Sequence, residues 1–292
     1  MTQPLTNATD DITLSIVLPA KNESQAVGGT VEKLRALYPD AEILVVNDGS
    51  TDDTGSISEA AGATVIWQPY SMGNGAAIKA GARHATGKVI VFMDADGQHD
   101  PADIPRLLER LEQGFDMVVG ARGNDSQASV GRGVANRFYN RLASWMVGQR
   151  IQDLTSGFRA VKADKFREFL HLLPNGFSYP TTTTMAFFRA GYPVAYEPIV
   201  AAKRIGKSHI RLFRDGIRFL LIIFKIGTLY SPLKLFLPIA FAHFLLGFGY
   251  YLYTFTVDHR LSSITIFLWS ASVTIFLIGL VSEQITQLMY KK

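Results

Sequence analysis

The sequence predicts an α/β protein in which a mostly parallel sheet with helices on both faces is followed by membrane-spanning helices. Short runs rich in β-branched residues alternate with helical patterns through the first 120 residues, which is the order of βαβ units. Two later stretches, 233–255 and 264–281, are strongly apolar, and Lys234, at the start of the first, is their only charged residue. Each is close to the length of about 20 residues that a helix needs to cross a bilayer.

The β-branched runs define the expected strands, which are 12–19, 41–48, 63–69, 88–94 and 115–121. The segments between them are long enough to form crossover helices. Another helix is expected at 130–146, and the rest of the second half is less regular. In doubly wound sheets ligands bind beyond the carboxyl ends of the strands. Polar residues gather at three such places, 19–23, 47–50 and 94–98.

The two apolar stretches explain a hydrophobic content of 48%, which is high for a purely soluble enzyme. The link between them is short, so they are expected to form a hairpin. Lysines and arginines concentrate before the first span and after the second, whereas the link contains only Arg260. The positive-inside rule then predicts a multi-pass protein of the plasma (inner) membrane with its large domain and both termini in the cytoplasm. The alternative is a buried soluble hairpin, but soluble helices are rarely apolar all round.

These patterns divide the chain into a flexible N-terminus (1–11), an α/β domain (12–208), an amphipathic interfacial helix (209–230) and the hairpin (231–292). The first residues are polar and do not resemble a signal peptide. The chain has no cysteine, which excludes disulfides and thiolate metal sites. The net charge of +4 lies mainly beside the apolar segments, so an anionic lipid or substrate is expected rather than nucleic acid.

Carboxylates cluster after the strand 88–94, where Asp94 and Asp96 flank Ala95. Hard oxygen ligands suit Mg²⁺ or Mn²⁺, which commonly keep positions for water and substrate phosphates. A metal site that binds a nucleotide diphosphate is therefore one interpretation. A solvated acidic turn is the other, and it would be preferred if the motif stood alone.

Two further motifs accompany it. Asp48 ends another strand in "VNDGSTDDT", where the carboxylate could bind a base or ribose, although capping of the next helix also explains it. Gly75 lies in "YSMGNGAAIKAG", a glycine-flanked helix start whose amides could approach a phosphate or sugar.

Six motifs in this order, "SIVLPAKNE", "VVNDGSTDDT", "GNGAAIKAG", "FMDADGQHDP", "DLTSGFRAVKADKF" and "RIGKSHI", precede the hairpin. Together they resemble glycosyltransferase family 2, in particular the polyprenyl-phosphate hexose synthases that include dolichyl-phosphate mannose synthase. The resemblance implies a GT-A fold and Mg²⁺ or Mn²⁺ as cofactor. It also implies inverting transfer of a hexose from a nucleotide diphosphate sugar, of the GDP-mannose or UDP-glucose type, to a polyprenyl phosphate.

The resemblance also implies roles for individual residues. The nucleotide-binding loop would contain Pro19, Ala20, Asn22 and Glu23, and Asp48 would read the base. Gly75 is a further candidate for substrate binding. The metal and diphosphate would be held by Asp94, Asp96 and Gln98. The acceptor phosphate would be held by Arg122, Arg132 and Asn136, so that Asp96, Arg122 and Arg132 are the expected catalytic residues. A late basic loop would close on the donor diphosphate through Arg204, Lys207 and Ser208.

Three positions depart from the family pattern, Lys21, Asn47 and His209, and they leave the base and the sugar open. Two other functions also remain open: transfer to a glycan or glycolipid hydroxyl, which would need a general base, and a catalytically silent nucleotide-sugar-binding subunit. Asp153 could be a turn cap and His99 could support the metal motif. The expected partners are the nucleotide sugar, the polyprenyl phosphate and the membrane, and a homo-oligomer is left open.

Overall fold

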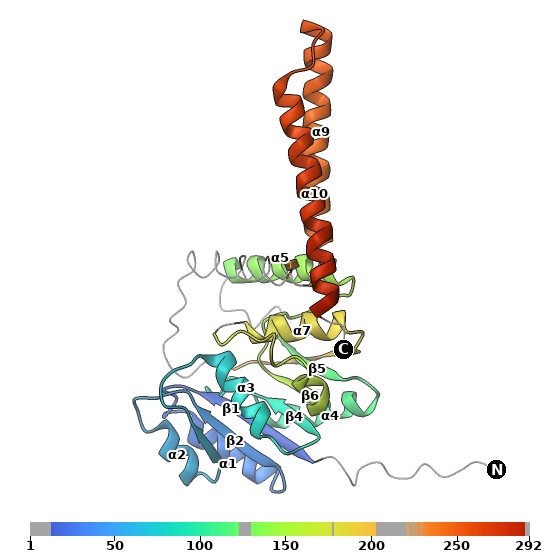
Figure 1. The fold of residues 1–292 in the computed structure, drawn as a ribbon. Helices are drawn as coiled ribbons and strands as arrows, with labels where there is room; N and C mark the ends of the chain where they lie inside the picture. Colours follow the sequence, from blue (N-terminus) through green and yellow to red (C-terminus); the bar gives the residue numbers. More distant parts are fainter. Residues whose placement is uncertain are drawn as a thin grey trace, which may run out of the picture. The chain divides into compact units, whose positions relative to one another are not determined.

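The structure is a computed structural model. It describes residues 13–122, 130–176, 178–202, 221, 224, 227–228 and 230–289, with side chains omitted for 130–136. The chain forms two compact units, Met1–Asn140 with Ile151–Leu212, and Arg141–Arg150 with Phe213–Lys292. The labels in Figure 1 are used below.

The first unit contains a seven-stranded sheet in the order β3-β2-β1-β4-β6-β5-β7. The strands are β1 (Leu14–Ala20), β2 (Glu42–Asn47), β3 (Thr64–Trp67), β4 (Val89–Phe92), β5 (Met117–Arg122), β6 (Arg159–Lys162) and β7 (Val194–Ile199). All neighbouring pairs are parallel except the two that include β6, which runs antiparallel to both β4 and β5. The predicted mostly parallel α/β sheet is therefore confirmed.

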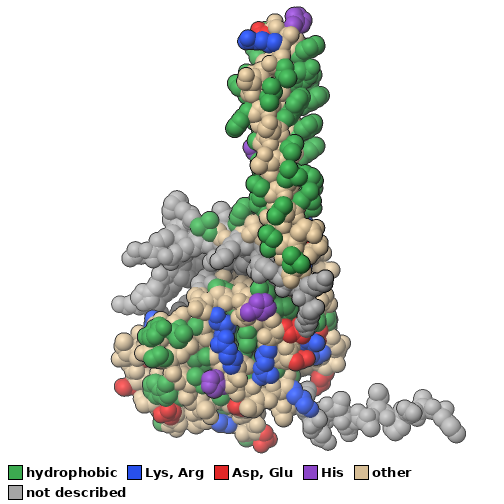
Figure 2. Space-filling view, viewed as in Figure 1, with side chains coloured by type: hydrophobic (Ala, Val, Ile, Leu, Met, Phe, Trp, Pro, Cys, Tyr) green, Lys and Arg blue, Asp and Glu red, His purple; other side chains and the backbone are tan. Residues whose placement is uncertain are grey.

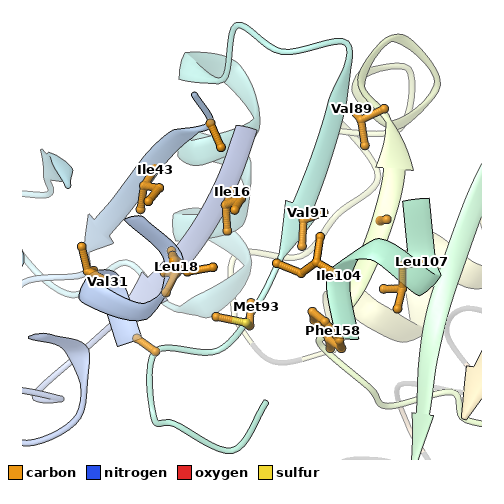
Figure 3. Packing of buried hydrophobic residues seen from close by; sticks show 14 of the residues in the cluster. Ile16, Leu18, Val31, Ile43, Val89, Val91, Met93, Ile104, Leu107 and Phe158 are labelled. Carbon is orange, nitrogen blue, oxygen red and sulfur yellow. The ribbon is translucent and has the colours of Figure 1, made fainter. Parts of the chain in front are cut away.

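Helices cover both faces of the sheet. In the first unit they are α1 (Val27–Leu37), α2 (Thr54–Ala60), α3 (Asn74–His84), η1 (Pro101–Asp103), α4 (Ile104–Glu112), α6 (Ala163–Arg167) and α7 (Tyr179–Arg189), and α5 (Val130–Val147) begins there. Figure 3 shows Ile16, Leu18 and Val91 of the sheet packed with Ile104 and Leu107 of α4. Burial on both faces accounts for the nearly continuous apolar runs of the central strands.

The opposite face of the sheet packs on α3, α6 and α7. The ring of Phe92 in β4 lies 4.7 Å from that of Phe166 in α6 and 6.1 Å from that of Tyr179 in α7. The close approach of α3 depends on Gly81, because a Cβ atom there would lie 2.3 Å from Val17 Cγ1. A glycine in the middle of a helix normally destabilises it, so packing explains its presence.

Strands β6 and β7 had not been expected from the sequence. Strand β6 has only four residues, and it begins and ends with Arg159 and Lys162, which hide its apolar centre. Its antiparallel register pairs Phe92 with Arg159 and Val91 with Ala160. This insertion places the residues just before β6 beside those just after β4.

The second unit contains the hairpin formed by α9 (Pro232–Asp258) and α10 (Ser263–Met289). Both helices are long and apolar enough to cross a membrane, at mean hydropathies of 1.7 and 2.3. Ser272 Oγ donates to the carbonyl of Ala240 at 2.8 Å, and Gly247 lies against the ring of Trp269. Most other side chains point outward, and Figure 2 shows hydrophobic groups along the hairpin surface. This outward apolar surface suits association with a membrane.

The last turn of α5 is fixed to the start of α9 within this unit. Lys234 Nζ donates to the carbonyl of Met146 at 2.9 Å, and Ser231 Oγ lies 3.4 Å from the same oxygen. A cation at a helix C-terminus is stabilised by the unpaired carbonyls and the helix dipole. The predicted N-terminus 1–11 and most of the predicted interfacial helix 209–230 lie outside the described residues, so the domain limits remain predictions.

Gly81 and Gly29 form a matched pair for testing helix packing. We expect Gly81→Ala to lower the free energy of unfolding by about 1–3 kcal/mol, because the methyl group overpacks α3 against β1. Gly29→Ala in α1, where nothing lies within 4 Å of the new methyl group, should raise it by about 0.5–1 kcal/mol. Urea unfolding of the full chain in detergent, followed by circular dichroism, measures both. Equal effects of the two substitutions would contradict this packing.

Candidate active site

A cleft of about 430 Å³ lies at the carboxyl ends of β1, β2 and β4. Its lining combines the loops that follow these strands with the start of α3: Pro19, Ala20, Lys21, Glu23, Asp48, Ser71, Gly73, Asn74, Ala77, Asp94, Ala95, Asp96 and Gln98. Seven residues predicted from the sequence therefore share one cavity. Its volume lies in the range of small-molecule and cofactor sites.

The loop after β1 is held by the loop after β2. Asn22 has a positive φ of 55°, and its side-chain oxygen accepts from the amide of Thr51 at 2.8 Å. The amide of Glu23 donates to Thr54 Oγ1 at 2.8 Å. Asn22 therefore shapes the loop, whereas Pro19, Ala20 and Glu23 line the cleft. The predicted contacts of these four residues with a nucleotide stay predictions.

Asp48 organises the segment between β3 and α3. Its carboxylate accepts from Ser71 Oγ at 2.9 Å and from the amides of Met72 and Gly73 at 2.6 and 3.0 Å. Lys21 Nζ in turn donates to Ser71 Oγ at 2.8 Å. Sequence reasoning had noted Lys21 only as a departure from the family pattern and had missed Ser71. Part of the bonding capacity of Asp48 is thus used within the protein, and its predicted role in reading the base remains a prediction.

Gly75 is explained by packing. Its amide donates to the carbonyl of Gly176 at 3.1 Å, and the amide of Ala76 donates to that of Asn175 at 2.8 Å. A Cβ atom on Gly75 would lie 2.0 Å from the carbonyl oxygen of Pro174. The first amides of α3 are thus satisfied by protein carbonyls, and the expected substrate contact of Gly75 has no support in this geometry.

The polar side chains that follow β4 divide into two groups. Asp94, Asp96 and Gln98 line the cleft, and Asp96 accepts from the amide of Gln98 at 3.1 Å. Asp100 instead caps η1, accepting from the amide of Ala102 at 3.1 Å. The Gln98 side chain also donates to the carbonyl of Ala202 at 3.3 Å. The acidic cluster is therefore in part a helix cap and in part cleft wall.

The donor set of Asp94, Asp96 and Gln98 fits a hard divalent cation. All three can offer oxygen atoms, and the Asp94 side chain is 36% exposed, so it can be reached from the cleft. Within the described residues no group of three or more His, Cys, Asp or Glu side chains could hold a metal by itself. Mg²⁺ is usually bound by one or two carboxylates when substrate phosphates complete its coordination, and Asp94 and Asp96 can supply these carboxylates.

Arg122, at the end of β5, is held by Asp153. Arg122 Nε lies 2.9 Å from Asp153 Oδ2, and the second bond, from Nη2 to Oδ1, is 3.1 Å long. The same nitrogen donates to Thr155 Oγ1 at 2.6 Å. Such two-point pairing fixes the plane of a guanidinium. Asp153, considered from the sequence as a turn cap, both caps the turn through the amides of Thr155 and Ser156 and orients Arg122.

Burial and pairing oppose each other in this ion pair. Burial alone would lower the pKa of Arg122, but its bonds to Asp153 and the nearby charge of Asp94 raise it overall. Burial would likewise raise the pKa of Asp153, whereas Arg122 and two backbone amides lower it below the usual range. Both groups are thus charged at neutral pH. The charge of Asp94 also influences Arg122, so the arginine lies within electrostatic reach of the proposed metal ligands.

The register of β6 explains how these groups come together. Phe92 pairs with Arg159, so Asp94, two residues after Phe92, meets Gly157, two residues before Arg159. A Cβ atom on Gly157 would lie 3.1 Å from Asp94 Oδ2. The loop that begins at Asp153 therefore contacts Arg122 at one end and Asp94 at the other. Sequence reasoning could not bring these residues together because it had not identified β6.

Buried polar groups hold this loop from behind. Tyr179 donates its hydroxyl to the carbonyl of Gly157 at 2.9 Å. Arg159, fully buried, donates to the carbonyls of Ser156 and Pro180, and its guanidinium carbon lies 5.5 Å from the centre of the Tyr179 ring. Burial lowers the pKa of Arg159 and raises that of Tyr179. The side chains of Arg132 and Asn136, and all of Arg204, Lys207 and Ser208, lie outside the described residues, so their roles remain predictions.

A mostly parallel sheet with paired aspartates in a cleft at its carboxyl edge is the arrangement expected of a GT-A glycosyltransferase. The comparisons with known proteins agree. The chain belongs to glycosyltransferase family 2, since residues 15–170 match the model described as "Glycosyl transferase family 2". Residues 231–288 match a second model, "GtrB C-terminal hairpin". The protein is therefore a glycosyltransferase whose C-terminal helices match a described hairpin.

Curated relatives include proteins named for lipid-phosphate substrates. Glycosyltransferase AglJ of Haloferax volcanii is 29% identical over 245 residues, covering 82% of this chain and 80% of the relative. Undecaprenyl-phosphate mannosyltransferase of Micrococcus luteus is 30% identical over 211 residues, covering 66% and 85%. Dolichyl-phosphate hexose transferase of Haloferax volcanii is 29% identical over 206 residues, covering 70% and 89%.

Solved structures show the same fold. Glucosyl-3-phosphoglycerate synthase from Mycobacterium tuberculosis superimposes with a TM-score of 0.62 at 21% identity, covering 74% of this chain and 80% of that one. A complex of the same enzyme with Mn²⁺, UDP and glucosyl-3-phosphoglycerate gives a TM-score of 0.59 at 24% identity, covering 73% and 80%. The GT-A fold predicted from the sequence is confirmed.

The Arg122–Asp153 pair predicts a pH-dependent loss of stability. Asp153→Asn should lower the free energy of unfolding at pH 7 by about 2 kcal/mol, because Arg122 loses its charged partner. The folded-state pKa of Asp153 is lowered, so its contribution is present above the unfolded pKa of about 4 and is lost as the pH falls further. The difference in free energy of unfolding between wild type and variant should therefore disappear as the pH falls from about 4 to the lower folded-state pKa of Asp153.

Urea unfolding at a series of pH values measures this gap. Asp164→Asn, at a side chain that is 71% exposed on α6, is the matched control and should show little difference from wild type. A gap for Asp153→Asn that stays constant down to acidic pH would show that the ion pair does not stabilise the fold.

Proposed function

We propose that the enzyme transfers a hexose, with inversion, from a nucleotide diphosphate sugar to the phosphate of a polyprenyl phosphate at the cytoplasmic face of the membrane. The observation that carries this proposal is the placement of Arg122, a cation oriented by Asp153, within electrostatic reach of Asp94. The names of the curated relatives and the C-terminal hairpin support a lipid phosphate as acceptor.

The cleft suits a nucleotide diphosphate that lies across the strand ends. Strands β2 and β4 flank β1, so their ends are separated by two strand spacings, or about 10 Å. Asp48, Ser71 and Lys21 form the wall on the β2 side, whereas Asp94, Asp96 and Gln98 follow β4. We assign the nucleoside to the first group and the diphosphate to the second.

A bound Mg²⁺ or Mn²⁺ would be held by Asp94, Asp96 and Gln98 and would offset the charge of the leaving diphosphate. The protein itself has to bring two anionic substrates together and orient them. Arg122 is oriented for the acceptor phosphate by Asp153 and Thr155. We propose that Arg132 and Asn136 also bind the acceptor phosphate. Arg204, Lys207 and Ser208 would bind the donor diphosphate.

A phosphate acceptor agrees with the charge state of Asp153. An alcohol is a poor nucleophile at neutral pH and needs a general base, whereas a phosphate monoester with a second pKa near 6 is already largely ionised. Asp153 lies beside Arg122, which we assign to the acceptor, but Arg122 lowers the pKa of Asp153 and so makes it a weak base. This favours the phosphate over the hydroxyl of a glycan or glycolipid.

Transfer can be tested directly with the purified full chain in detergent. Undecaprenyl phosphate is incubated with Mg²⁺ or Mn²⁺ and a panel of UDP- and GDP-sugars, and glycolipid is detected by mass spectrometry. We expect one donor to give product. The product should be labile to mild acid, and its anomeric configuration, determined by NMR, should be inverted relative to the donor. Asp96→Asn should lower the rate by about 100-fold or more, since it removes the negative charge of one proposed metal ligand.

Asp164→Asn again serves as the control, because this exposed residue lies outside the cleft and should leave the rate unchanged. Product with a glycan or lipid hydroxyl but none with undecaprenyl phosphate would overturn the proposed acceptor. An unchanged rate in Asp96→Asn would remove the proposed role of this residue.

The cytoplasmic orientation has a separate test, because the chain contains no cysteine. Ser262→Cys introduces a single thiol in the link between α9 and α10, and Ser56→Cys introduces one on the exposed side of α2. In intact spheroplasts, a membrane-impermeant maleimide should label position 262 but reach position 56 only after lysis. Labelling of position 56 in intact spheroplasts would reverse the proposed orientation.

A further inference from the structure

His99 lies five residues after Asp94 and is buried beside it. Its side chain is 4% exposed, and its ring stacks on Phe158 with centroids 5.1 Å apart and planes 16° apart. Phe158 is itself fully buried, and its carbonyl accepts from the amide of Gly120 at 2.9 Å. The imidazole is therefore fixed in position by packing.

One ring nitrogen of His99 has no hydrogen bond. Among the described residues Nδ1 has no hydrogen-bond partner, although it is buried. Buried polar atoms are nearly always paired, because an unpaired one loses its hydration without compensation. The nearby acceptor is Asp94 Oδ2, at 4.0 Å, which is too long for a hydrogen bond.

The carboxylate of Asp94 is confined between His99 and Gly157. The backbone of Gly157 lies so close that a Cβ atom there would be 3.1 Å from Oδ2 and 3.2 Å from Oδ1. The Gly157 peptide is in turn held by Tyr179. The imidazole cannot move without losing its stacking contact, whereas the Asp94 side chain is 36% exposed to the cleft and can turn. A shift of Asp94 Oδ2 by about 1 Å towards His99 Nδ1 would bring the two atoms to a hydrogen-bond distance near 3 Å.

We propose that His99 is a positioning residue for Asp94, donating a hydrogen bond from Nδ1–H to Oδ2 and thereby aiming the carboxylate at the divalent cation in the cleft. The inference rests on the metal site of the proposed function and adds a residue to it. Hydrogen bonds from behind a metal-binding side chain fix its orientation, and their loss typically weakens metal affinity by about 10–100-fold.

Two substitutions separate the hydrogen bond from the packing. His99→Phe keeps an aromatic ring that can stack on Phe158 but removes the donor. His99→Asn loses the ring but can place an amide nitrogen where Nδ1 lies, because both atoms are bonded to Cγ. Thermal unfolding should thus be closer to wild type in His99→Phe than in His99→Asn, whereas metal affinity should follow the opposite order.

The measurement is a titration of the purified full chain in detergent with Mn²⁺, alone and with UDP or GDP, in which electron paramagnetic resonance reports free Mn²⁺. We expect His99→Phe to bind Mn²⁺ about 10-fold or more weakly than wild type, and His99→Asn to stay within about 3-fold. Asp164→Asn controls for non-specific binding to surface carboxylates.

Unchanged Mn²⁺ affinity in His99→Phe would overturn the inference. An equal loss in both variants would also overturn it, since affinity would then follow the packing of the ring and not the donor. If the wild-type protein binds Mn²⁺ under neither condition, the metal site of the proposed function fails as well. These outcomes distinguish failure of the inference from failure of the site on which it rests.

Discussion

The antiparallel pairing of β6 with β4 is the constraint on which the candidate active site depends. A purely parallel sheet would leave β4 and β5 as neighbours and would carry no loop back to the end of β4. The inserted strand pairs Arg159 with Phe92, which sets Gly157 against Asp94 and places Asp153 within reach of Arg122. The four-residue antiparallel strand β6 thus brings the acidic end of β4 and the arginine at the end of β5 to the same loop.

This junction is built from polar groups in a dry environment. Arg159 is fully buried, and its guanidinium donates to carbonyl oxygens and to Thr184, with the ring of Tyr179 close by. Burying a cation without a paired acid is costly, and burial accordingly lowers its pKa. The cost is offset by several hydrogen bonds that fix the loop in one conformation. A rigid loop is what a site needs when it has to hold two anionic substrates in a defined geometry.

The sequence was sufficient for the parts of this fold that follow simple periodicity. The first five strands, the helices between them and the apolar hairpin all appear close to their expected positions. The clustering of Asp48, Asp94, Asp96 and Gln98 followed from a rule about parallel strand ends, and the cleft contains all four. Strand β6 was missed because a four-residue strand with charged ends has no visible alternation. The packing role of Gly75 could not be predicted, because a glycine required by packing looks the same in sequence as one that admits a ligand.

Contacts between distant residues were also beyond the sequence. The pairing of Arg122 with Asp153 spans 31 positions, and that of Lys21 with Ser71 spans 50. No local pattern records such pairs, and only the order of the strands creates them.

The link between the two long apolar helices has a consequence of its own. Helix α9 ends at Asp258 and α10 begins at Ser263, so four residues make the turn. A segment of this size cannot bury a core or shape a pocket. If the hairpin spans the bilayer, the four residues of this turn are too few to form a folded surface where the two helices emerge.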